Sequence, residues 1–202
     1  MIKYVVTALV AGGVAGYLNS NWGYVAGDVW VSDYAFNALL MLLLFVMGLA
    51  FAMDKESIAK IRRIGLKILV IPLVVALGSI LAGIVSGLIL GVNVVATAAV
   101  SAGYGWYTLA GPLAGQIFGA EWGALGFAAN FIRELLTIVT ISLMVKVDKY
   151  APIASGGATT MDTTLPVIVR YCGSEALITA FSSGFVLSLI APFTIVAIAS
   201  LA

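Results

Sequence analysis

Five long apolar stretches, separated by short polar segments, constrain the fold of this chain more than any other feature. They cover residues 4–18, 36–53, 66–91, 122–145 and 176–201. About 20 apolar residues span the hydrocarbon core of a bilayer, so these stretches predict transmembrane helices. Only 9% of the 202 residues are charged, whereas a soluble domain has about 25%. We therefore predict a single all-α polytopic membrane domain over residues 1–202. Because the first stretch is short and follows Lys3, a signal peptide is its alternative interpretation.

The residue types that the sequence lacks exclude several classes of function. The 202 residues include no histidine, which excludes a Ser-His-Asp triad, a histidine proton relay and histidine metal sites. The single cysteine, Cys172, excludes a disulfide within these residues. Ten basic residues balance nine acidic ones and form no separate basic stripe, so no nucleic-acid partner is expected. Nothing in the sequence indicates a cofactor.

The distribution of charge predicts the orientation in the membrane. Basic residues crowd the loop after the second stretch, namely Lys55, Lys60, Arg62, Arg63 and Lys67. Positively charged loops stay in the cytoplasm. The loop at 19–35 has two acidic residues and no basic one, which indicates the outer side. We therefore expect a multi-pass protein of the cytoplasmic membrane, with its N-terminus inside and its C-terminus outside.

Two segments rich in glycine and threonine interrupt the apolar pattern. They read "GYGWYTLAGP" at 103–112 and "SGGATTMDTTLPV" at 155–167. Irregular backbone at membrane depth is tolerated only where protein or water satisfies its polar groups. The charge pattern favours two re-entrant hairpins, 93–120 from outside and 151–173 from the cytoplasm; broken helices that cross fully are the alternative. Breaks that enter from opposite faces are typical of transporters with inverted repeats. Such repeats would cover residues 66–120 and 122–173.

Glu134 lies near the middle of the stretch 122–145. A carboxylate at the centre of an inserted helix costs about 2.5–3.5 kcal/mol, so it normally faces a cavity or a partner. Asn130 shares its helical face, as does Thr137 or Ile138, whereas Arg133 points about 100° away. We predict an inward-facing polar stripe around Glu134. The alternative for Glu134 and Arg133 is a structural pairing with neighbouring helices.

Asp162 is the other acidic residue expected at membrane depth, within the second break. One interpretation makes it a ligand-binding residue. The other makes it a turn residue or the N-cap of a short helix that begins near Leu165. The free N–H groups of such a helix start would favour an anionic ligand.

The polar residues of the two breaks suit a small ligand, because they combine hydroxyl groups, accessible backbone and aromatic faces. The candidates are Ser101, Gly103, Gly105, Trp106 and Tyr107 in the first break and Thr160, Thr163 and Thr164 in the second. A cationic ligand prefers a carboxylate together with an aromatic face. Glu134, Asp162 and Trp106 could provide these groups.

Three blocks of sequence, in the same order, resemble the LysO family of lysine exporters. They are "SAGYGWYTLAGPL" (101–113), "NFIRELL" (130–136) and "GGATTMDTTLPVIVRYCG" (156–173), and "LLLFVMGLAFAMDKESI" (42–58) is also similar. The resemblance implies export of L-lysine, and possible lysine analogues, and a requirement for Glu134. It also implies that longer members have additional N-terminal helices with a second acidic residue. This chain is expected to be a shorter form without them, with Asp54 as the candidate replacement and with a second copy or a small membrane subunit as its partner.

The expected mechanism is alternating-access exchange of lysine for protons. Moving one positive charge outward costs about 2.3 kcal/mol per 100 mV, and an incoming proton removes this electrical cost. Glu134 is suited to hold either the proton or the lysine ammonium group. The alternatives are a sodium-coupled carrier, a half-sized subunit that needs a partner chain, and an intramembrane enzyme with Glu134 and Asp162 as an acid pair. A transporter without enzymatic activity is the favoured interpretation.

Overall fold

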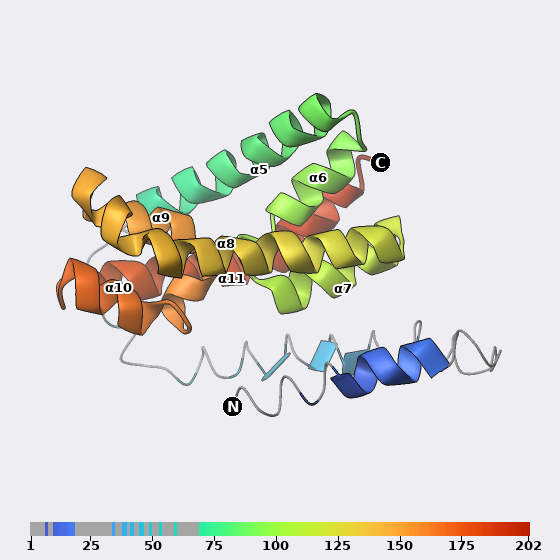
Figure 1. Cartoon of the computed structure of the whole chain (residues 1–202), viewed down its shortest axis with the longest axis horizontal. Helices are drawn as coiled ribbons and strands as arrows, with labels where there is room; N and C mark the ends of the chain where they lie inside the picture. The colour runs from blue at the N-terminus through green and yellow to red at the C-terminus, as the bar shows by residue number, and fades with distance from the viewer. Residues whose placement is uncertain are drawn as a thin grey trace. The chain divides into compact units, whose positions relative to one another are not determined.

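The computed structural model describes residues 69–202 continuously, together with residues 10–18 and scattered residues between 7 and 59. The chain divides into two compact units, Met1–Asp54 and Lys55–Ala202. Residues 10–18 are helical. The predicted spans 4–18 and 36–53 otherwise lie largely outside the described residues, as does Asp54. The second unit contains helices α5 to α11 (Figure 1).

Three helices of the described part are long enough and apolar enough to cross a membrane. They are α5 (Val70–Leu90), α8 (Ala120–Val147) and α11 (Ala176–Ala199). Their bounds agree closely with the predicted stretches, which confirms an all-α membrane fold. Large apolar side chains on α5 remain exposed within the chain, among them Leu73, Leu77 and Leu81. Such a face is compatible with lipid rather than water as its surroundings.

Two pairs of short helices lie between the long ones. The first pair is α6 (Val94–Ser101) and α7 (Tyr107–Phe118). The second is α9 (Ala151–Gly156) and α10 (Leu165–Cys172), joined through the 3₁₀ helix η3 (Gly157–Met161). A helix rises 1.5 Å per residue, so none of these helices covers a hydrocarbon core of about 30 Å.

The first pair enters and leaves at the same end of the bundle. Helix α6 runs back along α5, because Gly87 of α5 packs on Val94 and Gly83 packs on Ser101. An added Cβ at Gly83 would lie 2.5 Å from the Ser101 hydroxyl, so glycine is what permits this close approach. Figure 1 shows α6 beside the C-terminal half of α5.

Helix α7 then returns along α8 through a second glycine contact. Gly111 and Gly115 of α7 face Gly123 of α8, and Gly126 of α8 faces Ala110. The two helices are antiparallel and joined only through Gly119. The start of α8 therefore lies at the end of the bundle from which α6 entered.

The second pair enters from the opposite end, where α8 finishes. Helix α9 reaches back to the middle of α8, where the Ser155 hydroxyl lies 2.7 Å from that of Thr137. Helix α10 returns, and its Ile168 and Cys172 pack with Ile141 near the end of α8. The two segments are thus re-entrant hairpins of opposite direction, as predicted, and they do not cross fully. This arrangement fits the proposed inverted repeat, which stays a prediction.

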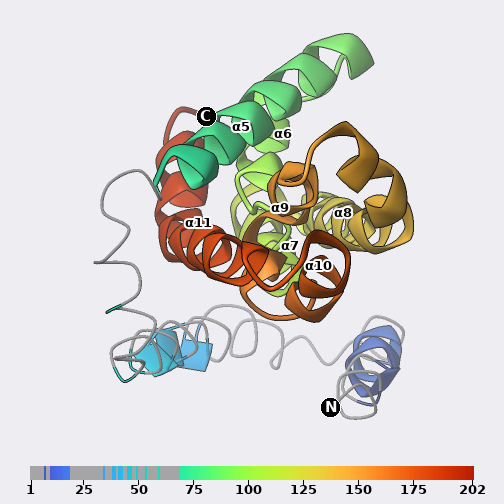
Figure 2. The same cartoon turned by 90° about the vertical axis from the view of Figure 1, so that its left-hand side faces the viewer.

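The tips of the two hairpins meet inside the bundle. The Ala158 N–H donates to the carbonyl oxygen of Tyr104 at 2.8 Å. Tyr104 has a φ of 53° and is fully buried, and the next residue, Gly105, has a φ of 100°. Viewed along the bundle, the short helices α7 and α9 lie between α5, α8 and α11 (Figure 2). Irregular backbone is therefore enclosed by protein, as membrane depth requires.

Both breaks contain fewer non-helical residues than the sequence suggested. Helix α7 already begins at Tyr107 and includes Pro112, although 103–112 was expected to be irregular. Gly111 does not end the helix but permits contact with Phe127 of α8. In the second hairpin α10 begins at Leu165 with Pro166 in its first turn, where the missing N–H of proline carries no penalty.

Candidate functional site

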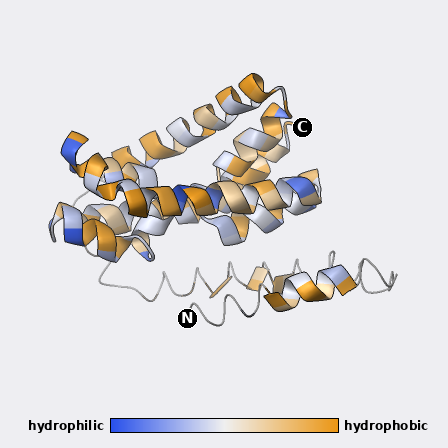
Figure 3. Ribbon diagram, in the orientation of Figure 1, coloured by the Kyte–Doolittle hydropathy of each residue, from blue (hydrophilic) through white to orange (hydrophobic). Residues whose placement is uncertain are grey.

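Glu134 occupies the middle of α8, and its side chain is only 7% exposed. Asn130 is buried as well, as the spacing predicted, and of the two alternatives Thr137 and Ile138 it is Thr137 that is buried. Figure 3 shows this hydrophilic band in the middle of α8 between hydrophobic turns. The Oε2 atom of Glu134 is buried and has no hydrogen-bond partner among the described residues. An unpaired buried carboxylate oxygen is costly, which marks this position as a candidate binding group.

The surroundings of Glu134 come from both hairpins. Its carboxyl group lies beside the Thr163 hydroxyl and within electrostatic reach of Asp162. Tyr107, the first residue of α7, is within electrostatic reach of both acidic residues. The structure therefore brings together four of the predicted site residues, Glu134, Asp162, Thr163 and Tyr107.

Two helix N-termini also begin in this region. The N-cap residues of α7 and α10 are Trp106 and Thr164, and neither side chain caps its helix by a hydrogen bond. Free N–H groups at a helix start carry partial positive charge. The breaks thus offer donors next to Glu134, an arrangement that accommodates a negative charge at membrane depth.

Asp162 is a turn residue and not the N-cap of α10. Its Oδ1 accepts a hydrogen bond of 2.5 Å from the backbone N–H of Thr163, while Thr164 takes the N-cap position. The N-cap interpretation is therefore wrong, because α10 begins at Leu165 as expected and Thr164, not Asp162, directly precedes it. Asp162 and Thr163 are exposed within the chain, which leaves them open to a ligand.

The other threonines of the second break hold the hairpin in place. Thr160 is fully buried and donates to the Ala180 carbonyl of α11 at 2.8 Å. The Thr159 and Thr164 hydroxyls lie 3.3 Å apart within the tip. Thr160 and Thr164 are thus engaged in internal contacts, and Thr163 is the candidate threonine with an open position.

The candidates in the first break have different surroundings. Gly103 packs against the Asn130 side chain, and Ser101 lines a cavity beside α5. The Trp106 indole donates to the Thr108 hydroxyl at 2.9 Å. Tyr107 lies edge-on to Phe127 and Phe131 of α8, with ring centroids 5.3 and 5.4 Å apart. Tyr107 is therefore the aromatic residue that the structure places beside Glu134.

Asn130 ties the first hairpin to α8. Its Oδ1 accepts from the Gly105 N–H at 2.7 Å, and its Nδ2 donates to the carbonyls of Val100 and Gly126 at 3.0 and 2.9 Å. A side-chain amide can satisfy irregular backbone on both sides of a break because it has donors and an acceptor. The structure thus gives Asn130 the geometry of a positioning residue.

We expect Asn130→Ala to lower the free energy of unfolding by about 1–3 kcal/mol, because the buried Gly105 N–H would lose its acceptor. Thermal unfolding of the purified protein in detergent would measure the change. Asn93→Ala is the matched control, because Asn93 caps α6 at the other end of the hairpin by accepting from Val95 and Ala96. Loss of such a cap costs about 1 kcal/mol. If the Asn130 variant were no less stable than this control, the hydrogen bonds of Asn130 to the first hairpin would not contribute specially to stability.

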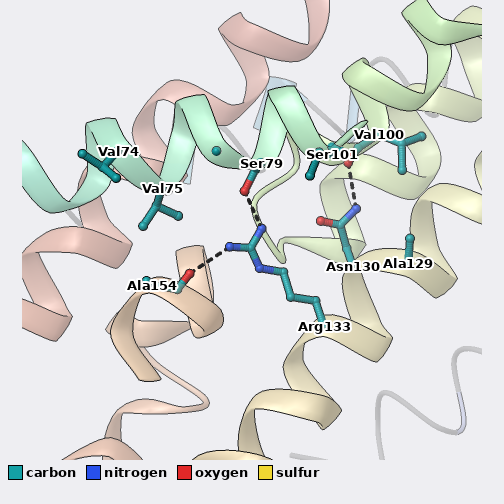
Figure 4. Close-up of a pocket in the computed structure, with 11 residues that line it drawn as sticks. Val74, Val75, Ser79, Val100, Ser101, Ala129, Asn130, Arg133 and Ala154 are labelled. Atoms are coloured by element: carbon teal, nitrogen blue, oxygen red, sulfur yellow. Dashed lines mark hydrogen bonds between the residues drawn. The ribbon is translucent and has the colours of Figure 1, made fainter. Parts of the chain in front are cut away.

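Arg133 points away from Glu134, toward α5 and α9. Its Nη1 donates to the Ser79 hydroxyl at 2.8 Å, and its Nε and Nη2 donate to the carbonyls of Ser155 and Ala154 at 2.7 and 3.0 Å. It lines an open cavity of about 470 Å³ whose lining residues come from α5, α6, α8 and α9 (Figure 4). The two neighbouring charges of α8 therefore serve separate regions.

The sequence reasoning did not identify several polar residues of the interior. Ser79 is a lone hydroxyl within the apolar "VALGSILAG" of α5, and Ser182 and Ser183 are buried in α11. The hydroxyls of Ser182 and Ser183 have no hydrogen-bond partner among the described residues. A serine in an otherwise apolar span is a signal that could have indicated these positions.

Comparisons with known proteins point to one family. The family model described as "Lysine exporter LysO" matches residues 6–199. The chain is 31% identical over 158 residues to the lysine exporter LysO of Escherichia coli (strain K12), a match that covers 77% of this chain and 52% of that protein. It is 26% identical over 197 residues to a Haemophilus influenzae protein named "Putative lysine exporter", with 96% of each covered.

The chain spans about half the length of the E. coli relative and nearly all of the H. influenzae one. No solved structure matches it significantly. The family match extends over all three blocks in which the sequence resembles these exporters. The chain therefore belongs to the LysO family of lysine exporters.

Proposed function

We propose that this chain exports L-lysine across the cytoplasmic membrane in exchange for protons, with Glu134 as the carboxylate that both cations share. The single observation that carries the proposal is the buried Glu134 carboxylate, with an unpartnered oxygen, at the point where both hairpins turn. Family membership supports lysine as the cargo.

The surroundings of Glu134 suit a cation that binds and leaves. A buried carboxylate is tolerated either in its protonated form or when it is paired with a cation. Lysine ammonium and a proton therefore compete for the same group, which couples their movements. Asp162, on the open side, adds a second negative charge, and the Tyr107 ring adds an aromatic face.

Access from the two sides follows from the hairpins. One hairpin enters from each end of the bundle, and their tips are joined through Tyr104 and Ala158. A small movement of one tip against the other would open the site to one side at a time, in the manner of transporters with broken helices. If the transport path needs a second chain, this chain acts as a homo-oligomer or together with a small membrane subunit.

The test is counterflow of labelled L-lysine in liposomes that contain the full chain alone. We expect labelled lysine to accumulate against unlabelled lysine, and a pH gradient to drive the flux without sodium. Protein-free liposomes provide the background. Flux that followed a sodium gradient and ignored the pH gradient would favour the sodium-coupled alternative. No flux from this chain, but flux after a partner chain is added, would favour the half-sized subunit.

A further inference from the structure

A second, half-buried charge lies at the level of the hairpin crossing, on a different face of α8 from Glu134. The Arg133 guanidinium group projects into the cavity of about 470 Å³ beside α5 (Figure 4). Its three hydrogen-bond acceptors are the Ser79 hydroxyl and the carbonyls of Ala154 and Ser155. All three are neutral groups, so they orient the guanidinium without cancelling its charge.

The positive charge of Arg133 is not neutralised by any described residue that lines the cavity. No acidic residue is among the lining residues, and no described carboxylate forms a salt bridge with Arg133. The carbonyl end of a helix contributes at most about half a negative charge, and α9 has only six residues. Buried charges are normally paired. The cavity is therefore an electropositive site at membrane depth.

The guanidinium group also keeps donors for a ligand. Arginine has five N–H groups, and three of them have acceptors here. One N–H on Nη1 and one on Nη2 have no acceptor among the described residues. A planar guanidinium matches a planar carboxylate better than any other side chain does. Apolar side chains such as Val74 and Val75 also line the cavity.

We propose that this cavity binds the α-carboxylate of an amino acid, with Arg133 as its anchor. The inference rests on the proposed function for the identity of the cargo, because the α-carboxylate is the only anionic group of L-lysine. The cavity volume lies within the range of about 300–1,000 Å³ that is usual for small-molecule sites. Arg133 would then recognise the carboxylate in this cavity, whereas Glu134 and Asp162, which do not line the cavity, would recognise the cationic group from their separate region.

Three ligands separate these two roles in a competition assay against labelled L-lysine on the purified full chain. L-norleucine has the carboxylate and nearly the same side chain but no ε-ammonium group. Cadaverine has two ammonium groups and no carboxylate. We expect Arg133→Gln to lower the affinity for L-lysine and L-norleucine at least tenfold and to leave the affinity for cadaverine unchanged, because only the first two bind through a carboxylate. Glu134→Gln should lower the affinity for cadaverine and leave the affinity for L-norleucine unchanged.

Arg133→Lys keeps the positive charge but loses the planar guanidinium group, so it should weaken the binding of L-norleucine several-fold. If Arg133→Gln does not give a monodisperse protein, Arg133→Lys takes its place in the comparison of the three ligands. The inference is overturned if Arg133 variants weaken cadaverine as much as L-norleucine, or if the wild type does not prefer L-lysine to cadaverine. Direct binding of labelled L-norleucine that depends on Arg133, without any binding of L-lysine, would instead retain the carboxylate site and reject lysine as the cargo.

Discussion

Replacing Glu134 by glutamine should reduce pH-driven lysine flux in liposomes to the level of protein-free liposomes. Glutamine has nearly the same shape, so the fold should persist, but it neither releases a proton nor pairs with an ammonium group. Glu134 is only 7% exposed, and the nearest other carboxylate, Asp162, lies in an open turn. No buried acidic residue of the described part is therefore in a position to replace it.

The matched control is Glu121→Gln, the same chemical change in the first turn of the same helix. Glu121 is exposed, so this variant should transport lysine at the wild-type rate. Equal amounts of each variant in the liposomes, checked by size-exclusion chromatography before reconstitution, exclude misfolding as the cause. If Glu134→Gln retained full pH-driven flux, the coupling role of Glu134 would have to be abandoned.

The two charges of α8 match the helix ends that surround them. Helices α6 and α9 run inward and end at the crossing, and α7 and α10 begin there. Carbonyl groups gather at the first kind of end and N–H groups at the second. Arg133 donates to the carbonyls at the end of α9, and Glu134 lies beside the starts of α7 and α10. The adjacent residues Arg133 and Glu134 thus face the two kinds of helix end: the arginine faces carbonyl groups and the glutamate faces N–H groups.

The sequence was sufficient to predict the features that depend on local patterning. Apolar runs predicted α5, α8 and α11, and the spacing of Asn130 and Glu134 predicted one buried face, because helical periodicity fixes which side chains share a face. The choice between Thr137 and Ile138 on that face was left open. Charges in the loops favoured re-entrant hairpins, which the structure contains.

The features that depend on long-range contact were not predictable in the same way. Gly111 and Pro112 indicate a break by composition, yet they lie inside α7 because α8 packs against the glycine. Nor could the sequence pair Ser79 with Arg133, since these residues are 54 positions apart. Asp162 could not be assigned to a turn or a cap until Thr164 was seen to occupy the N-cap position of α10.

Gly157→Ala should disrupt the contact between the two hairpins and destabilise the protein by about 3 kcal/mol or more. Gly157 has a φ of 63°, and an added Cβ would collide with the carbonyl oxygen of Tyr104. The ψ of Gly157, −125°, lies outside the left-handed helical region. Sparsely populated backbone of this kind costs a residue with a side chain about 1–3 kcal/mol, and forcing a group into a packed interior adds about 1–3 kcal/mol. The Tyr104 carbonyl cannot move away freely, because it accepts the hydrogen bond from Ala158.

Gly91→Ala is a control for a positive φ without a collision. Gly91 has a φ of 66° and a ψ of 29°, in the left-handed helical region, and an added Cβ there meets nothing within 4 Å. This control should therefore show the cost of left-handed helical backbone alone, with a small decrease in unfolding temperature and normal lysine counterflow. Gly157→Ala should show a much larger decrease and little transport, because the crossing that positions Glu134 between the hairpins depends on this contact. Equal unfolding temperatures for the two variants would mean that the tips do not pack as the Tyr104–Ala158 hydrogen bond indicates.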